Sequence, residues 1–221
     1  MDIIVSPEIW TRFPGMRILC VTGHLTNHEP KPEVIEALNT AQDKITPESL
    51  EHPNLQAWRE AYLQGGISMG KYPCSIQAMV KRISKGGRVP SINPLVDFYN
   101  SISIGNITPL SGMDLDQLDG PQQLRQTKEG EMFKGIGAEQ PELVQPGEIC
   151  YSDDSHIITR HFCWRQAAKG AITSETTRFI LISEIIKEQP VELLDSVREQ
   201  LLSGLEKHFG ITAKWEVISQ S

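Results

Sequence analysis

Most signals that would place this chain in a familiar class are missing from its sequence. No apolar run approaches the ~20 residues that cross a bilayer, so we expect no membrane-spanning helix and no membrane partner. The start, residues 1–5, lacks the basic region and the long apolar stretch of a signal peptide. We therefore expect a cytoplasmic protein.

Cysteine pairs and metal-binding patterns are missing as well. The 4 cysteines lie far apart with no Cys-x-x-Cys pair, which suggests neither a zinc site nor a disulfide framework, and we expect reduced thiols. His156 and His161 are five positions apart, on opposite faces of an expected strand, so they should not share a metal ion. No metal site is predicted.

Motifs for nucleotide cofactors and for nucleophilic catalysis are also missing. Gly135-Ile136-Gly137 lacks the third glycine of a dinucleotide-binding turn, and Gly86-Gly87 lacks the Lys-Ser/Thr of a phosphate-binding loop. The chain contains no Gly-x-Ser-x-Gly elbow and no cysteine within a known nucleophile signature. We therefore expect no cofactor, and no nucleophile can be assigned by motif.

An excess of positive charge is missing too. The formal net charge is −7, which argues against a protein that binds long nucleic acid such as DNA by bulk charge, because neutralising phosphates requires clustered Lys and Arg. Any RNA contact must therefore be local. Two basic clusters could provide one: Lys81, Arg82, Lys85 and Arg88, and further on Arg160, Arg165, Lys169 and Arg178. Solvated surface charge is the simpler interpretation of both.

What the sequence does contain is the pattern of one large α+β domain. Its 221 residues, 39% hydrophobic and 22% charged, fit a single globular unit over residues 1–221, without a repeat or a convincing linker. Helical spacing predicts helices near residues 32–38, 55–64, 75–85 and 93–105, and a last one over 190–210. Apolar or alternating runs predict strands at 17–23, 124–126, 149–151, 157–164, 179–183 and 212–218.

The helix that begins near residue 93 carries the first candidate site residues. Asn93 has the chemistry of a helix cap, and Pro94 suits the first helical position because it lacks an N–H that would be unpaired there. Asp97 and Asn100 follow three apart, on one face of an otherwise apolar helix opening. Buried polar groups cost several kcal/mol unless paired, so either that face is solvated or these side chains hold a loop or a ligand.

A second candidate surface is the predicted strand 157–164. Alternation places Ile158, Phe162 and Trp164 on a packed face, and it places on the free face Thr159, His161, Cys163 and Arg165. A lone histidine such as His161 is more often a surface or satisfied residue than a base. The preceding Asp153-Asp154 pair favours a turn.

The order of these segments resembles a known domain. Residues 90–100, which read PSINPLVDFYN, and residues 108–114, TPLSGMD, are similar to the stretch of the phenylalanyl-tRNA synthetase beta subunit that reads N-x-V-V-D-V-T-N-Y and then Q-P-L-H-A-F-D. Residues 130–131, 146–153 and 173–184 are similar to the rest of that domain. Residues 58–62, 71–75 and 82–87 look like free-standing B3/B4 proteins. The chain thus resembles a free-standing B3/B4 editing domain over residues 10–185, followed by a helix and strand over 190–218.

This resemblance implies a fold and an activity. It implies an α+β fold with a β-sandwich or barrel core and flanking helices, and a pocket for the 3′-terminal adenosine of an aminoacyl-tRNA. In the synthetase, the domain hydrolyses tyrosine wrongly esterified to phenylalanine tRNA. The expected activity is therefore deacylation of a misacylated tRNA in trans, without aminoacylation by this chain alone. Such hydrolysis needs no side-chain nucleophile if the pocket orients a water molecule.

The resemblance also assigns site residues. The family's pocket Asn falls on Asn100, its Thr on Tyr99 and its His on Ser111, while the small residues of the pocket fall near Ser152 and Asp153. Its pocket Glu falls near Ala167 or Ala168. The expected catalytic residues are Asn100, Ser111 and Asp153, and the expected substrate-binding residues are Asp97, Tyr99, Ser152, His161 and Arg165. The cluster Lys81, Arg82, Lys85 and Arg88 is the expected RNA contact.

Two other functions stay open at this point. The replacement of the pocket His and Glu also fits a non-catalytic tRNA- or RNA-binding module that keeps the fold. The acidic charge fits an adaptor that docks on a tRNA synthetase or another translation protein, because fold does not determine function. The amino acid that an editing enzyme of this kind would remove is open as well.

Overall fold

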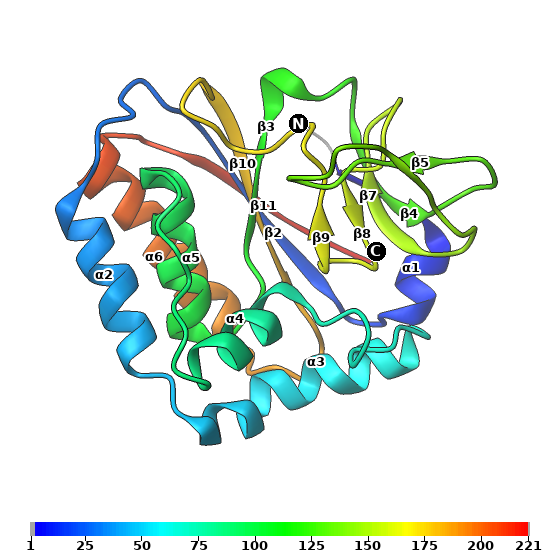
Figure 1. Cartoon of the computed structure of the whole chain (residues 1–221), viewed down its shortest axis with the longest axis horizontal. Helices are drawn as coiled ribbons and strands as arrows, with labels where there is room; N and C mark the ends of the chain where they lie inside the picture. Colours follow the sequence, from blue (N-terminus) through cyan, green and yellow to red (C-terminus); the bar gives the residue numbers. More distant parts are fainter. Residues whose placement is uncertain (1–2, 221) are drawn as a thin grey trace.

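The computed structural model describes residues 3–220 and shows an α+β fold built on one antiparallel sheet (Figure 1). Its strand order is β11 (Lys214–Ser219), β2 (Arg17–His24), β10 (Arg178–Ile185) and β3 (Ser111–Asp114). The central strands β2 and β10 are apolar along most of their length because both faces of the sheet are covered. The α+β class predicted from the sequence is confirmed.

Helices cover the first face of this sheet, where α2 (Pro32–Asp43), α5 (Pro94–Asn106) and α6 (Leu193–Phe209) lie together (Figure 1). Odd-numbered residues of the central strands, such as Leu19 and Leu181, pack into this helical core. Even-numbered residues, such as Cys20 and Ile182, face a second core on the other side. This alternation determines which side chains of β10 can reach the site described below.

The second core lies between the sheet and α1 (Pro7–Arg12), α3 (Pro53–Gln64) and α4 (Ser75–Ile83). It also contacts a three-stranded sheet with the order β1 (Ile3–Val5), β4 (Gln122–Gln126) and β7 (Ile149–Ser152). Two small hairpins adjoin it: β5 (Met132–Phe133) with β6 (Glu142–Leu143), and β8 (Thr159–Arg160) with β9 (Arg165–Gln166). The short 3₁₀ helices are η1 (Pro47–Glu51) and η2 (Leu115–Gln117). Within residues 3–220 these sheets stay open and form no closed barrel.

Every predicted helix is confirmed, with bounds that shift by a few residues. Asn93 caps α5 as expected, because its side-chain oxygen accepts a hydrogen bond of 3.0 Å from Val96 N. The last helix ends at Gly210, whose φ of 67° is the left-handed cap that glycine adopts easily. No helix among the described residues is long and apolar enough to cross a bilayer.

The predicted strand over residues 157–164 is wrong. Only Thr159–Arg160 forms a strand there, and the chain then turns back into β9 through His161 and Phe162, whose φ angles are 44° and 67°. The Thr159 hydroxyl donates to Phe162 O at 2.6 Å and accepts from Tyr151 N at 3.0 Å. These hydrogen bonds hold a turn that has no Gly, Pro, Asn or Asp to reveal it in the sequence. The two alternating faces predicted for this segment therefore do not exist.

Candidate functional site

A cavity of about 190 Å³ opens between α4, α5, β3 and the turn that follows β8. It brings together four residues that the sequence assigned to the site: Tyr99, Asn100, Ser111 and Arg165. Glu184 also lines it and is the one carboxylate among the described residues that do so. We call this space the Glu184 cavity.

The fold explains why these side chains meet. Tyr99 and Asn100 are adjacent on α5, which packs against the sheet, while Ser111 begins β3. In the sheet Ser111 pairs with Ile182, two positions before Glu184 on the neighbouring strand. Residues 111 and 184 therefore reach the same end of the sheet although 73 positions separate them in the sequence.

Glu184 is the functional candidate that sequence reasoning missed. Its side chain is 1% exposed and accepts a 2.7 Å hydrogen bond from the hydroxyl of Tyr151. Burial raises the pKa of this carboxyl above its ordinary value, and the Tyr151 hydrogen bond lowers it in part. The signal was present in the sequence as a charged residue inside the apolar run of residues 179–186. The resemblance had placed the pocket glutamate near Ala167 or Ala168, neither of which lines the Glu184 cavity.

Asn100 and Ser111 line this cavity with polar groups that form no hydrogen bond to another described residue. No described residue hydrogen-bonds the Asn100 amide or the Ser111 hydroxyl, and both side chains are half-buried. The neighbouring Gln166 differs, because its amide donates to Gly112 O at 2.9 Å. Asn100 and Ser111 therefore each offer a free hydrogen-bond donor in the cavity that Glu184 also lines.

Asp97 holds a loop and does not line the cavity. It is 1% exposed, so the solvated interpretation is wrong for this residue. Its carboxylate accepts a hydrogen bond from Ile92 N at 2.8 Å and another from the Ser91 hydroxyl. These contacts fix the chain that leads into α5, which makes Asp97 a residue that supports the position of Asn100.

Ser152 and Asp153, which the sequence also assigned to the site, lie elsewhere. The Ser152 hydroxyl accepts a 2.9 Å hydrogen bond from Arg125 Nε. The Asp153 carboxylate accepts three backbone N–H bonds, from residues 119, 155 and 156, at 2.6 to 3.0 Å. Neither residue lines the Glu184 cavity, so the structure does not support a catalytic Asp153. Its acceptor sites are used by the turn that the Asp-Asp pair predicted.

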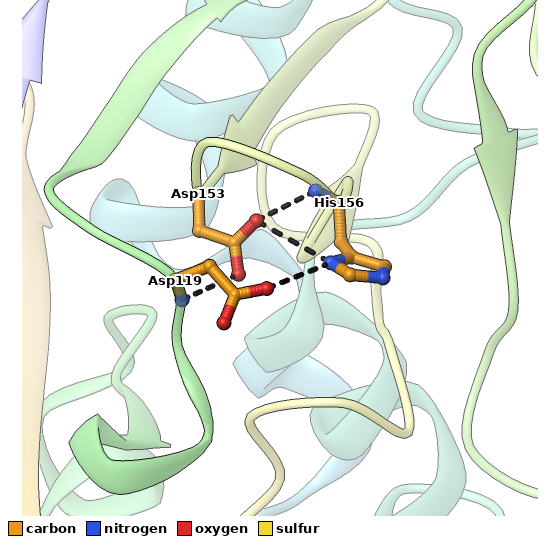
Figure 2. Close-up of side chains that lie close together, drawn as sticks. All are labelled: Asp119, Asp153 and His156. Carbon is orange, nitrogen blue, oxygen red and sulfur yellow. Dashed lines mark hydrogen bonds and ion pairs between the residues drawn. The ribbon is translucent and has the colours of Figure 1, made fainter.

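Asp153 does belong to the one cluster of metal-ligand types found among residues 3–220 (Figure 2). Asp119 Oδ2 and Asp153 Oδ1 each lie 3.6 Å from His156 Nδ1. Asp119 is also bound by the ammonium group of Lys169 at 2.5 Å. Because these carboxylates already have protein partners, the cluster is best explained as a stabilised turn.

His161 does not line the Glu184 cavity either. Its ring stacks on Tyr72 with 3.4 Å between centroids. Its Nε2 lies 3.2 Å from Glu148 Oε2, outside good hydrogen-bond geometry, and Glu148 is held by two hydrogen bonds from Arg160. Burial lowers the pKa of His161 from its ordinary value of 6.5 to about 4, with Arg160 and Lys71 adding to the effect and Glu148 opposing it.

This low pKa predicts a loss of stability in acid. Between pH 6.5 and about 4 the unfolded chain binds a proton at residue 161 that the folded chain does not, so the free energy of unfolding should fall as the pH falls through this range. After allowance for solvent screening we expect a contribution on the order of 1 kcal/mol. Urea unfolding of the wild type and of His161→Gln, measured at pH 7 and pH 4.5, should show a weaker pH dependence in the variant. If the free energy of unfolding depended on pH equally in the two proteins, His161 would not be the source of the loss of stability in acid.

The two basic clusters differ in how many of their cations are paired with other side chains. Lys81, Arg82 and Lys85 are exposed near the end of α4, the helix whose Ser75 and Met79 line the Glu184 cavity. The fourth member, Arg88, is bound to Asp43 and Asn39. In the second cluster three cations are in ion pairs: Arg160, Lys169 and Arg178. Within residues 3–220, Arg165 forms no ion pair.

The sequence matches a known protein family, and the fold is similar to that of a solved structure. A family model described as the B3/4 domain matches residues 57–196, which is more than half of the chain. No curated protein matches the chain significantly. One similar solved structure is an N-terminal fragment of the phenylalanyl-tRNA synthetase beta subunit from Pyrococcus horikoshii, with a TM-score of 0.49 and 9% identity. The match covers 96% of this chain and 50% of that one, so this chain spans half of the fragment.

Proposed function

The chain belongs to the B3/4 domain family, and on that premise we propose that it hydrolyses the ester bond of a misacylated tRNA in the Glu184 cavity. One observation carries the proposal: a buried carboxyl group with a raised pKa lies in the same small cavity as the free donors of Asn100 and Ser111. The resemblance of residues 90–114 to an aminoacyl-tRNA editing domain supports the choice of substrate. The reaction would take place in the cytoplasm, where charged tRNA is used.

The proposed reaction is direct attack by water. The Glu184 carboxylate takes a proton from a water molecule as the water oxygen bonds to the ester carbonyl carbon. Burial raises the pKa of the Glu184 carboxyl, so the carboxylate binds a proton more readily than a solvated one, which suits it to this exchange of protons. The carbonyl oxygen becomes negative and accepts hydrogen bonds from the Asn100 amide and the Ser111 hydroxyl. The bond to the ribose oxygen then breaks, and that oxygen takes the proton back from Glu184.

The remaining polar groups position these three residues. The Tyr151 hydroxyl fixes the orientation of the carboxyl group, and the contacts of Asp97 fix the start of α5. Cys163 also lines the cavity, but burial raises the pKa of its thiol well above the ordinary value, so it stays protonated at neutral pH. A cysteine in that state is a poor nucleophile, which favours water as the attacking group.

The proposal is tested with a panel of mischarged tRNAs, each carrying a radiolabelled amino acid. We expect the protein to release at least one amino acid faster than the uncatalysed reaction, and to spare the matching correctly charged tRNA. Catalysis by general acid–base chemistry alone typically accelerates a step about 10²- to 10⁴-fold, which this assay resolves easily. Background rates across the whole panel would refute the proposal. Salt-sensitive tRNA binding without turnover would instead indicate a non-catalytic binding module.

A further inference from the structure

Strand β11 is one edge of the main sheet, and its outer side has no hydrogen-bond partner within residues 3–220. On the inner side it pairs with β2 along the whole of Lys214–Ser219. No other described residue hydrogen-bonds the backbone of this strand. The N–H and C=O groups that point away from β2 are therefore available to a further strand.

The opposite edge of the same sheet, strand β3, already has hydrogen-bond partners within the chain. Asp114 N donates to Gly170 O at 2.9 Å. The Gln166 side chain donates to Gly112 O at 2.9 Å. Because this edge is occupied, copies of the chain can extend the sheet only by pairing β11 with β11. Pairing of like edges gives a closed two-fold dimer and not an open fibre.

Strand β11 also exposes large apolar side chains. Trp215 is 49% exposed and Val217 is 36% exposed. They pair with Val21 and Leu19 of β2, so both lie on the face of the sheet that carries the helices. Free edge strands of native proteins usually avoid such residues, because an apolar edge with open backbone groups pairs readily with another chain.

The Trp215 ring is held in a defined position at this edge. The guanidinium of Arg198, on α6, lies 4.6 Å from the centre of the ring. Arg198 is itself paired with Asp195 at 2.8 Å. A cation stacked in this way restricts the motion of the ring, so less freedom is lost when a partner packs against it.

The charges of β11 favour a second copy of the same strand as the partner. Lys214 and Glu216 are exposed on either side of Trp215. If two copies pair antiparallel about a two-fold axis at Trp215, each Lys214 lies opposite Glu216 of the partner subunit, and the two tryptophans lie opposite each other. Opposite charges and aromatic pairs directly across a sheet are stabilising.

The same charges disfavour the neighbouring registers. Moving the axis to Lys214 would place two lysines opposite each other, and moving it to Glu216 would place two glutamates opposite each other. Like charges in these positions are destabilising. A single charge on an edge strand repels a copy of itself and so protects the edge, whereas opposite charges two positions apart attract a copy in one register.

We propose that the protein forms a two-fold dimer through antiparallel pairing of β11, with Trp215 at the axis. The two four-stranded sheets then join into one continuous sheet. Strand β3, whose Ser111 lines the Glu184 cavity, is the far edge of each half, so the entrances to both cavities are distant from the joined edges. The dimer does not depend on the proposed hydrolysis.

Sedimentation equilibrium of the full chain, from the low micromolar range upward, tests the dimer. The mass of the wild type should rise with concentration toward twice that of one chain. By symmetry Lys214→Glu makes two attractive pairs repulsive, so we expect the dissociation constant to rise about tenfold. Glu216→Lys should act in the same way. The double variant Lys214→Glu with Glu216→Lys restores opposite charges across the axis and should recover the wild-type dissociation constant.

Leu63→Glu is the control, because Leu63 is 80% exposed on α3 and lies outside the proposed interface. It should leave the dissociation constant unchanged. A wild type that stays monomeric at every concentration would overturn the proposal and leave β11 open to a strand of a different protein. A dimer that the single charge variants do not weaken, or that the double variant does not recover, would overturn it as well.

Discussion

The variant Glu184→Gln is expected to lose at least about 100-fold in kcat for deacylation, because it keeps the shape of the side chain but cannot accept a proton from water. KM should change little, since the amide still fills the same position beside Tyr151. Single-turnover deacylation of the tRNA identified in the panel measures both quantities. Activity within a factor of two of the wild type would remove Glu184 from the mechanism.

The loss should not come from unfolding. The folded-state pKa of Glu184 is raised, so its neutral form is the one that folding favours, and its contribution to stability falls as the pH rises through that pKa. A neutral glutamine avoids the burial of a charge at neutral pH. The free energy of unfolding of Glu184→Gln at pH 7 should therefore equal or exceed that of the wild type, which urea unfolding can measure.

The variant Tyr151→Phe distinguishes a positioned base from a structural carboxyl group. The Tyr151 hydrogen bond lowers the pKa of Glu184, so its removal should raise that pKa further. When kcat is measured as a function of pH, its rise on the acid side should then move to higher pH, while the plateau value of kcat falls only modestly. A change that affects the fold alone would scale the profile without shifting it along the pH axis.

The second large effect is expected for Asn100→Ala, which should lower kcat about 10²- to 10³-fold, the usual cost of removing one donor to a developing oxyanion. The Asn100 amide lines the cavity without a hydrogen bond to any described side chain, so its removal leaves no buried partner unpaired. Stability should change little for the same reason. Steady-state kinetics together with thermal unfolding would test both statements.

Asn106→Ala is the matched control for this variant. Asn106 lies at the end of the same helix, but its amide donates to Ile102 O at 2.8 Å and contacts Gln200, away from the cavity. We expect this control to lower stability slightly and to leave kcat near the wild-type value. If both variants reduced kcat to the same extent, the effect would belong to the helix and not to the amide of Asn100.

The sequence by itself determined the helices, the buried central strands and part of the site. The Asn93-Pro94 cap predicted α5, and the apolar runs of residues 17–23 and 179–183 predicted two central strands of the main sheet, because both signals depend on neighbouring residues alone. Asn100 and Ser111 were found through the resemblance of residues 90–114 and do line one cavity. The B3/4 family assignment is confirmed.

Only the tertiary structure decided which polar groups are free to act. The turn at His161 and Phe162 depends on the Thr159 hydroxyl and on contacts with β7, so the alternation of residues 157–164 could not reveal it. The resemblance assigned Asp153 as a catalytic residue and left Glu184 without a role. In the structure, however, the Asp153 oxygens accept hydrogen bonds from backbone N–H groups, while Glu184 is buried and lines the cavity. Hydrogen-bond partners and burial come from residues distant in the chain, and they determine whether a side chain stabilises a turn or has a pKa suited to chemistry.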